Sequence, residues 1–239
     1  MNKNLLKYIG LIAVVVLFAF IFIPEIISRI NSGTRVEKED LQKRVPLAYI
    51  HIDEQKKRIP SFAFYNQDSL LISEQDLLGK VYVVEFFFAS CPTICPIMSK
   101  NLVEVQNEFL DNDHFGIASF TIDPKHDTPE VLKSYAERYG IVDMDWHLLN
   151  GTEEQVYELA NAGFNIYAQQ MENVPGGFEH SGLFALIDKQ GYIRSRRDPF
   201  GNPIVYYRGA IDLADGANEF GETEQITILI EDIKKLLNE

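Results

Sequence analysis

The sequence is poor in cysteine and in positive charge. Its 239 residues include only two cysteines, Cys91 and Cys95, which are too few for a disulfide framework. There are 22 Lys and Arg against 35 Asp and Glu, which gives a formal net charge of −13. This balance argues against a nucleic-acid partner, because the phosphates would be repelled. The chain also has no internal repeat and no low-complexity tract, so we expect one ordinary packed domain.

Charge is absent from a long stretch near the N-terminus. Residues 8–24 are uncharged and almost all Ile, Leu, Val, Phe and Ala. The run is close to the roughly 20 residues that span a bilayer and longer than the core of a typical secretory signal. Since no small-x-small cleavage site follows it, an uncleaved anchor is favoured over a cleaved signal peptide. Lys3 and Lys7 precede the run, which places the N-terminus in the cytoplasm and the rest of the chain across the membrane.

These features predict three regions. Residues 1–30 form a transmembrane anchor, residues 31–45 a polar tether, and residues 46–239 a single domain. We therefore expect a single-pass protein of the cell inner membrane with its domain in the periplasm. That compartment permits disulfides, so the redox state of the two thiols has to be controlled.

Within the domain, apolar runs typical of strands alternate with segments of helical periodicity. Strands are predicted at residues 81–88, 115–122, 146–149, 183–187 and 192–194, and helices at residues 96–109, 127–139, 152–162 and 224–237. Residues 70–79 are predicted to form a turn of helix, and Asp127 is predicted to cap the helix that follows it. This order predicts an α/β sandwich around a mixed β-sheet.

The two cysteines follow directly after the strand at residues 81–88. If a helix begins at about Pro92, Cys91 and Cys95 lie on one helical face, with Cβ atoms roughly 5–6 Å apart. That separation suits either one soft metal ion or one disulfide. Unpaired N–H groups at the start of such a helix would lower the pKa of Cys91. Burial of both cysteines as small apolar residues is the alternative, and the flanking Pro92 and Pro96 disfavour it.

Two thiolates alone make an incomplete metal site, so a third ligand is needed from elsewhere in the fold. His180 ranks first because it stands in a glycine-rich loop directly before the strand at residues 183–187, although a histidine in such a loop is more often solvated. The other four histidines are interpreted as surface, turn or core residues: His51, His114, His126 and His147.

Three motifs occur in order along the chain: Cys-Pro-Thr-Ile-Cys-Pro at residues 91–96, Asp-Pro-Lys-His-Asp-Thr-Pro at residues 123–129, and His-Ser at residues 180–181. They resemble those of the SCO/SenC family of membrane-anchored copper chaperones, which have a thioredoxin-like fold and help to assemble the copper centre of cytochrome oxidases. Two features depart from the family pattern. The residues directly before the first cysteine are Phe88-Ala89-Ser90 here, and the polar segment at residues 194–212 is longer than expected.

The resemblance implies that Cys91, Cys95 and His180 bind one copper ion, as Cu(I) or Cu(II). It also implies a copper-receiving subunit of a respiratory oxidase as partner, and a thiol reductant of thioredoxin type that keeps the cysteines reduced. Asp123 is a candidate to orient a ligand or merely a turn residue. Met98 and Met171 are weaker candidates, and Met98 is more typical of core packing. We expect a metallochaperone rather than a turnover enzyme.

Two other classes stay open. The first is a thiol–disulfide oxidoreductase or redox sensor of thioredoxin type, although three residues rather than two separate the cysteines. The second is a peroxidase-like thiol enzyme, in which Cys91 attacks peroxide and Cys95 resolves the product. The residues before Cys91 do not resemble a peroxiredoxin motif.

Overall fold

The computed structural model describes residue 12 and residues 15–24, 45–171 and 173–239. Residues 46–239 form one compact unit. Most of the predicted anchor at residues 1–30 and nearly all of the predicted tether at residues 31–45 lie outside the described residues, and residues 15–24 are helical. In the described stretches, no helix combines the length and the apolar character needed to cross a bilayer.

The domain is built on a mixed sheet. Its strands in the described part of the chain are β1 (Ala48–Tyr49), β6 (Val81–Phe87), β7 (Phe115–Thr121), β8 (Trp146–Leu149), β11 (Leu183–Ile187), β12 (Ile193–Ser195) and β13 (Tyr207–Arg208). The order is β1-β12-β11-β6-β7-β8, with β13 paired to β11. Strands β6, β7 and β8 are parallel, whereas β11 is antiparallel to β6. The predicted α/β sandwich around a mixed sheet is therefore confirmed.

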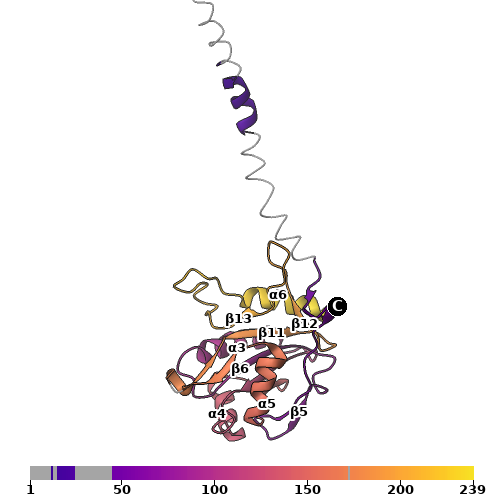
Figure 1. Ribbon diagram of the computed structural model, residues 1–239, viewed down its shortest axis with the longest axis vertical. Helices are drawn as coiled ribbons and strands as arrows, with labels where there is room; N and C mark the ends of the chain where they lie inside the picture. Colours follow the sequence, from indigo (N-terminus) through magenta and orange to yellow (C-terminus); the bar gives the residue numbers. More distant parts are fainter. Residues whose placement is uncertain (1–11, 13–14, 25–44, 172) are drawn as a thin grey trace, which may run out of the picture. The chain divides into compact units, whose positions relative to one another are not determined.

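Helices lie on both sides of this sheet. They are α3 (Cys95–Phe109), α4 (Pro129–Tyr139), α5 (Glu153–Tyr157) with its π-helical continuation η1 (Glu158–Phe164), the 3₁₀ turn η2 (Pro175–Gly177), and α6 (Ile226–Leu237). Figure 1 shows α6 above β11 and β12. Helix α3 contacts both α6 and α4, and Tyr135 of α4 packs on Phe87 of β6, whereas Phe164 of η1 packs on the adjacent Phe86. Because successive side chains of a strand point to opposite faces, α3, α4 and α6 cover one face of the sheet and α5 with η1 covers the other. Thr152 caps α5 through the reciprocal bonds of a capping box with Gln155.

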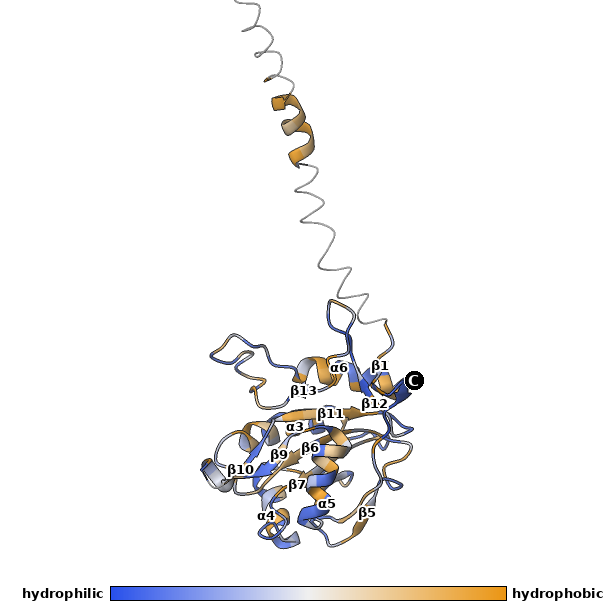
Figure 2. Ribbon diagram, in the orientation of Figure 1, coloured by the Kyte–Doolittle hydropathy of each residue, from blue (hydrophilic) through white to orange (hydrophobic). Residues whose placement is uncertain are grey.

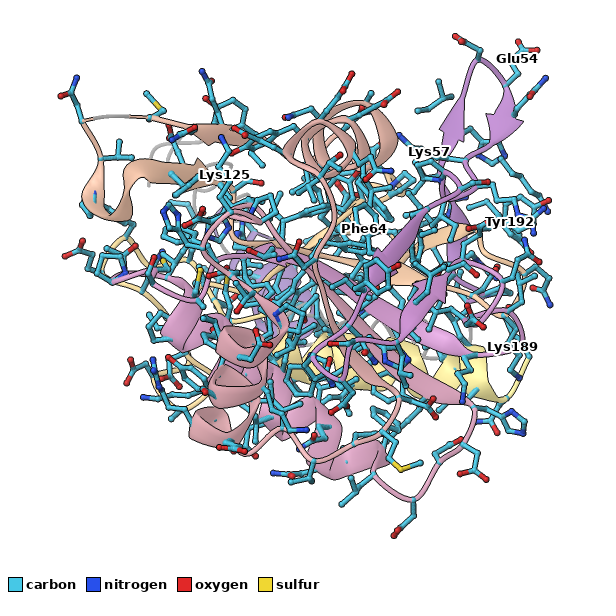
Figure 3. The ribbon with its side chains drawn as sticks, turned by 90° about the horizontal axis from the view of Figure 1, so that it is seen from below. Glu54, Lys57, Phe64, Lys125, Lys189 and Tyr192 are labelled. Carbon is cyan, nitrogen blue, oxygen red and sulfur yellow. The ribbon has the colours of Figure 1, made fainter. Side chains whose placement is uncertain are left out.

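The core forms where the sheet meets these helices. All seven residues of β6 and all seven of β7 are buried, as expected for parallel strands covered on both faces. Figure 2 shows β11 in the colours of hydrophobic residues. Figure 3 shows Phe64 in the interior, where its ring lies 5.4 Å from that of Phe120. The ring of Phe120 also stacks on that of Phe86, with centroids 5.5 Å apart, so this aromatic cluster packs against β6, the strand that leads to the two cysteines.

Three two-stranded pairs lie outside the central sheet. They are β2 (His51–Ile52) with β3 (Gln55–Lys56), β4 (Ala63–Tyr65) with β5 (Leu71–Ser73), and β9 (Ala168–Gln170) with β10 (Phe178–His180). Glu54 lies at the tip of the β2–β3 hairpin in Figure 3. The predicted turn of helix at residues 70–79 is wrong for residues 71–73, which pair with β4 instead, whereas residues 74–79 form turns closed by i→i+3 hydrogen bonds. Tertiary pairing of the backbone has overridden the local pattern there.

Candidate metal centre

Both cysteines lie where the chain leaves strand β6. The strand ends at Phe87, and the N–H of Cys91 donates to the carbonyl of Phe88 in a turn, with an N···O distance of 3.2 Å. Helix α3 then begins at Cys95. Cys91 therefore lies in a loop, and Cys95 is the first residue of a helix.

This start of α3 agrees with the helix predicted at residues 96–109, but it rules out the start at about Pro92 on which the predicted spacing of the cysteines depended. A helix from Pro92 would carry Pro96 in its second turn, where the missing N–H and the clash with the preceding turn cost about 3 kcal/mol. With the start at Cys95, Pro96 falls in the first turn, where no intrahelical N–H bond is needed. The cysteines are therefore not an i, i+4 pair on one helical face, and the loop brings Cys91 toward Cys95.

His180 reaches the same place from a different part of the fold. It is the last residue of β10, it is aligned with Ala168 of β9, and 9% of it is exposed. The prediction placed it in a glycine-rich loop, whereas the structure places it in a short paired strand. The glycines are at the β9–β10 turn, where Gly176 and Gly177 have positive φ. The ring of His180 stands edge-on to that of Phe88, with centroids 6.0 Å apart.

The structure brings the three predicted ligands together. The ligand atoms of Cys91, Cys95 and His180 all lie within 4.8 Å of one another, and Cys95 Sγ lies 3.1 Å from His180 Nε2. All three residues are buried, with Cys91 the more exposed of the two cysteines. Among the described residues, no other group of three or more His, Cys, Asp or Glu side chains is recorded at such spacing. Two sulfurs and one imidazole nitrogen form a donor set that suits copper or zinc.

The electrostatics of the two thiols differ. The hydrogen bond from Cys95 lowers the pKa of Cys91 to about 3, with smaller contributions from His180 and from backbone N–H groups. Burial raises the pKa of Cys95 well above its ordinary value, and the neighbouring Cys91 adds to that increase. Cys91 is therefore the thiolate of the pair at neutral pH, and Cys95 keeps its proton until its sulfur binds a metal or forms a disulfide.

Asp127 has a different role from the predicted one. Thr128 caps α4, and its hydroxyl accepts from the N–H of Val131. The buried carboxylate of Asp127 instead accepts a bond of 2.9 Å from the N–H of Ala89 and a second bond from the hydroxyl of Thr121. Burial raises the pKa of Asp127, and these two bonds oppose that effect. Asp127 thus ties the second motif to the loop that carries Cys91.

The remaining candidates lie outside the ligand cluster. Asp123 is buried, and its carboxylate lies 2.8 Å from Nδ1 of His126 rather than beside a cysteine. Met98 is fully buried in the core, as the helical spacing predicted. Met171 is partly exposed. His147, also predicted as a core residue, is partly buried and contacts Asn66.

Sequence analysis missed Glu85, a buried carboxyl in the middle of β6. The hydroxyl of Ser119 donates to Oε1 over 2.6 Å, whereas Oε2 has no recorded partner. Burial raises the pKa of Glu85 to about 7. Its sequence signal was available, because Glu85 is the only charged residue in the apolar run at residues 81–88.

Comparison with known proteins agrees with this architecture. The family model described as SCO1/SenC matches residues 51–210. The SCO1 protein homolog of Bacillus subtilis is 30% identical over 137 residues, which cover 56% of this chain and 70% of that protein.

Solved structures show the same fold. BsSco, a member of the Sco family of cytochrome c oxidase assembly proteins in which a disulfide switch was identified, matches with a TM-score of 0.60 and 26% identity, over 77% of this chain and 96% of that one. Copper-bound ScoI of Bradyrhizobium japonicum matches with a TM-score of 0.52 and 23% identity, over 59% of this chain and 89% of that one. These likenesses support the predicted thioredoxin-like sandwich.

Proposed function

The chain belongs to the SCO1/SenC family, and we propose that it is a chaperone that carries one copper ion on Cys91, Cys95 and His180. The convergence of these three buried side chains carries the proposal. Cu(I) prefers soft thiolates and accepts few ligands, and imidazole suits both oxidation states of copper. Copper is the cargo of such a protein, so the site has to release the ion as well as bind it.

The placement of His180 supports a route for release. Strands β9 and β10 form a separate pair of three residues each, outside the central sheet. A movement of this hairpin would withdraw the imidazole without breaking any pairing in the central sheet. Copper would then remain on the two thiolates, open to an incoming ligand of the recipient. We propose that this recipient is the copper-receiving subunit of a respiratory oxidase, in line with the oxidase assembly role named for the Sco family.

A thiol–disulfide reaction is a second candidate, and the unequal thiol pKa values favour it. The Cys91 thiolate would attack a disulfide of the recipient and form a mixed disulfide, releasing one recipient thiolate. Cys95 would then lose its proton and attack the Cys91 sulfur, which frees the second recipient thiolate. The recipient gains two electrons and the chaperone is left with a Cys91–Cys95 disulfide, so a reductant of thioredoxin type is needed to restore it.

Membrane anchoring is part of the proposal. The apolar run at residues 8–24 supports a single span, with the N-terminus in the cytoplasm and residues 46–239 in the periplasm. Extraction of membranes at alkaline pH tests the anchor, because a spanning protein stays with the membrane pellet. Reporter fusions after residue 45 test the side, since alkaline phosphatase is active only in an oxidising compartment. Activity of a cytoplasmic reporter at the same position would overturn the topology.

Copper binding is tested on the reduced full-length protein in detergent. We expect one Cu(I) per chain to remain bound through gel filtration in the presence of a competing chelator. Reduction of insulin or of peroxide at ordinary enzyme rates, with no copper retained, would favour the oxidoreductase or peroxidase classes instead.

A further inference from the structure

A buried amide on α3 holds the segment that follows the metal site. Asn101 is 1% exposed, and its Nδ2 donates to the carbonyls of Gly209 and Ile211 over 2.9 and 2.8 Å. Its Oδ1 accepts from the N–H of Leu213 over 3.0 Å. We call residues 209–213 the strap. One side chain thus satisfies three backbone groups of the strap, and these bonds are strong because the amide is removed from water.

The strap in turn holds the backbone beside His180. The N–H of Gly209 donates to the carbonyl of Gly182 over 2.8 Å, two residues after His180. Gly182 has a φ of 61°, and a Cβ placed there would lie 2.9 Å from Cβ of Ala210 in the strap and 3.2 Å from Cδ1 of Ile94. The chain after His180 is therefore packed between the strap and the residue that precedes Cys95.

These contacts link His180 back to the helix that carries Cys95. Cys95 begins α3, and Asn101 lies six residues later on the same helix. From Asn101 the contacts run through the strap to Gly182 and so to His180, whose Nε2 lies 3.1 Å from Cys95 Sγ. We propose that Asn101 is a positioning residue that holds His180 over Cys95 through the strap. This inference rests on the proposed copper site and assigns the part of the fold that keeps the nitrogen ligand in place.

The same helix supplies a matched control. Gln106 is fully buried, its Nε2 donates to the carbonyl of Gly140, and its Oε1 accepts from the N–H groups of Val142 and Asp143. It makes the same kind of three-bond clamp on a segment that leads to β8, which carries no ligand. Asn101→Ala and Gln106→Ala should lower Tm to a similar extent, so any difference at the metal site reports on positioning.

The test compares Asn101→Ala, Gln106→Ala and the unchanged full-length protein. For Asn101→Ala we expect Cu(II) affinity to fall about 10–100-fold, as on loss of a residue that orients a ligand, with an altered Cu(II) EPR spectrum and Cu(I) affinity within about threefold. Without metal, the ring resonances of His180 should shift or broaden in Asn101→Ala alone. Gln106→Ala should leave all of these unchanged.

A double substitution separates positioning from general loosening. In a His180→Ala background, where Cu(I) persists on the two thiolates, Asn101→Ala should leave the Cu(I) affinity within about threefold. Equal effects of Asn101→Ala and Gln106→Ala on Cu(II) affinity, or a Cu(I) loss of about tenfold or more in the His180→Ala background, would overturn the proposal. If Asn101→Ala does not fold, Asn101→Ser, which retains a hydroxyl, takes its place with the same two outcomes. If the unchanged protein binds no copper, the proposed function fails, and the metal-free His180 resonances still decide whether Asn101 positions the ring.

Discussion

Cys95 Sγ lies 3.1 Å from His180 Nε2, although 85 positions of sequence separate the two residues. At this distance the sulfur and the ring nitrogen are within hydrogen-bonding reach of each other. A metal ion that binds both atoms has to displace any proton on them, since thiolate sulfur and neutral imidazole are the forms that bind metals. Copper affinity should therefore fall as the pH is lowered.

Removal of either thiol should abolish tight Cu(I) binding. For Cys91→Ser or Cys95→Ser we expect the Cu(I) affinity to fall by more than about a hundredfold, because one thiolate with one imidazole is a harder and weaker donor set. Competition with a Cu(I) chelator measures the change. Ser90→Ala, next to Cys91, is the control and should bind normally. Stoichiometric copper on either cysteine variant would rule out the three-ligand site.

His180→Ala should affect the two oxidation states of copper unequally. Cu(I) persists on two thiolates, whereas Cu(II) favours nitrogen and oxygen ligands and should lose its site. Parallel titrations with Cu(I) and Cu(II) measure the difference, and His147→Ala serves as the control, because His147 contacts Asn66 and is not one of the clustered ligands. Equal losses for both ions would show that His180 is not a ligand.

Alkylation should distinguish the two cysteines. Because Cys91 is already a thiolate, its rate of reaction with iodoacetamide should be nearly flat between about pH 5 and pH 8. Cys95→Ala removes the hydrogen bond that lowers the pKa of Cys91, so the rate in that variant should rise with pH over the same range. Mass spectrometry of the products identifies the modified residue. A rate in the unchanged protein that climbs about tenfold per pH unit would contradict the assignment.

Glu85→Gln should change how stability depends on pH. The pKa of Glu85 is about 7 in the folded protein and ordinarily 4.5, so the folded state binds an extra proton between these values. Stability then falls as the pH rises through that window. The glutamine variant lacks this loss, and at pH 8 it should be more stable than the unchanged protein by up to about 3 kcal/mol.

Urea unfolding at pH 4.5 and pH 8 measures this difference in the free energy of unfolding. Glu108→Gln is the control, since Glu108 is an exposed residue of α3 paired with Lys234. An advantage of Glu85→Gln that is the same at both pH values would show that the carboxyl does not titrate in this window.

Oxidation should form a reversible Cys91–Cys95 disulfide that prevents copper uptake. The free thiols lie close together, but Cys91 is held by the turn to Phe88, so bridging requires a local rearrangement of the loop. We expect a reduction potential above about −300 mV, in the range of labile rather than structural bridges. Equilibration with glutathione or dithiothreitol buffers measures it. A lower potential would make the bridge a permanent cross-link and exclude a redox-controlled site.

The sequence by itself determined the features that depend on neighbours along the chain. The apolar run of β6, the helical spacing after Cys95 and the capping box at Thr152 are local patterns, and each element formed where its pattern lies. The start of α3 was also open to local reasoning, because Pro96 excludes a start at Pro92. The motif around the cysteines is also local, and it indicated metal or redox chemistry without knowledge of the fold.

Only the tertiary structure decided which distant side chains meet. The pairing of β9 with β10 places His180 beside Cys95. Its position before the strand at residues 183–187 ranked this histidine first among the five without establishing it as a ligand. Asp127 has a local pattern that predicts a helix cap, yet its carboxylate turns inward to Ala89. Asn101 has no sequence signal, because an amide in a helix acquires a role only when packing brings unpaired backbone groups to it. Contacts of this kind depend on sheet order and burial, which the spacing of residues along one segment does not encode.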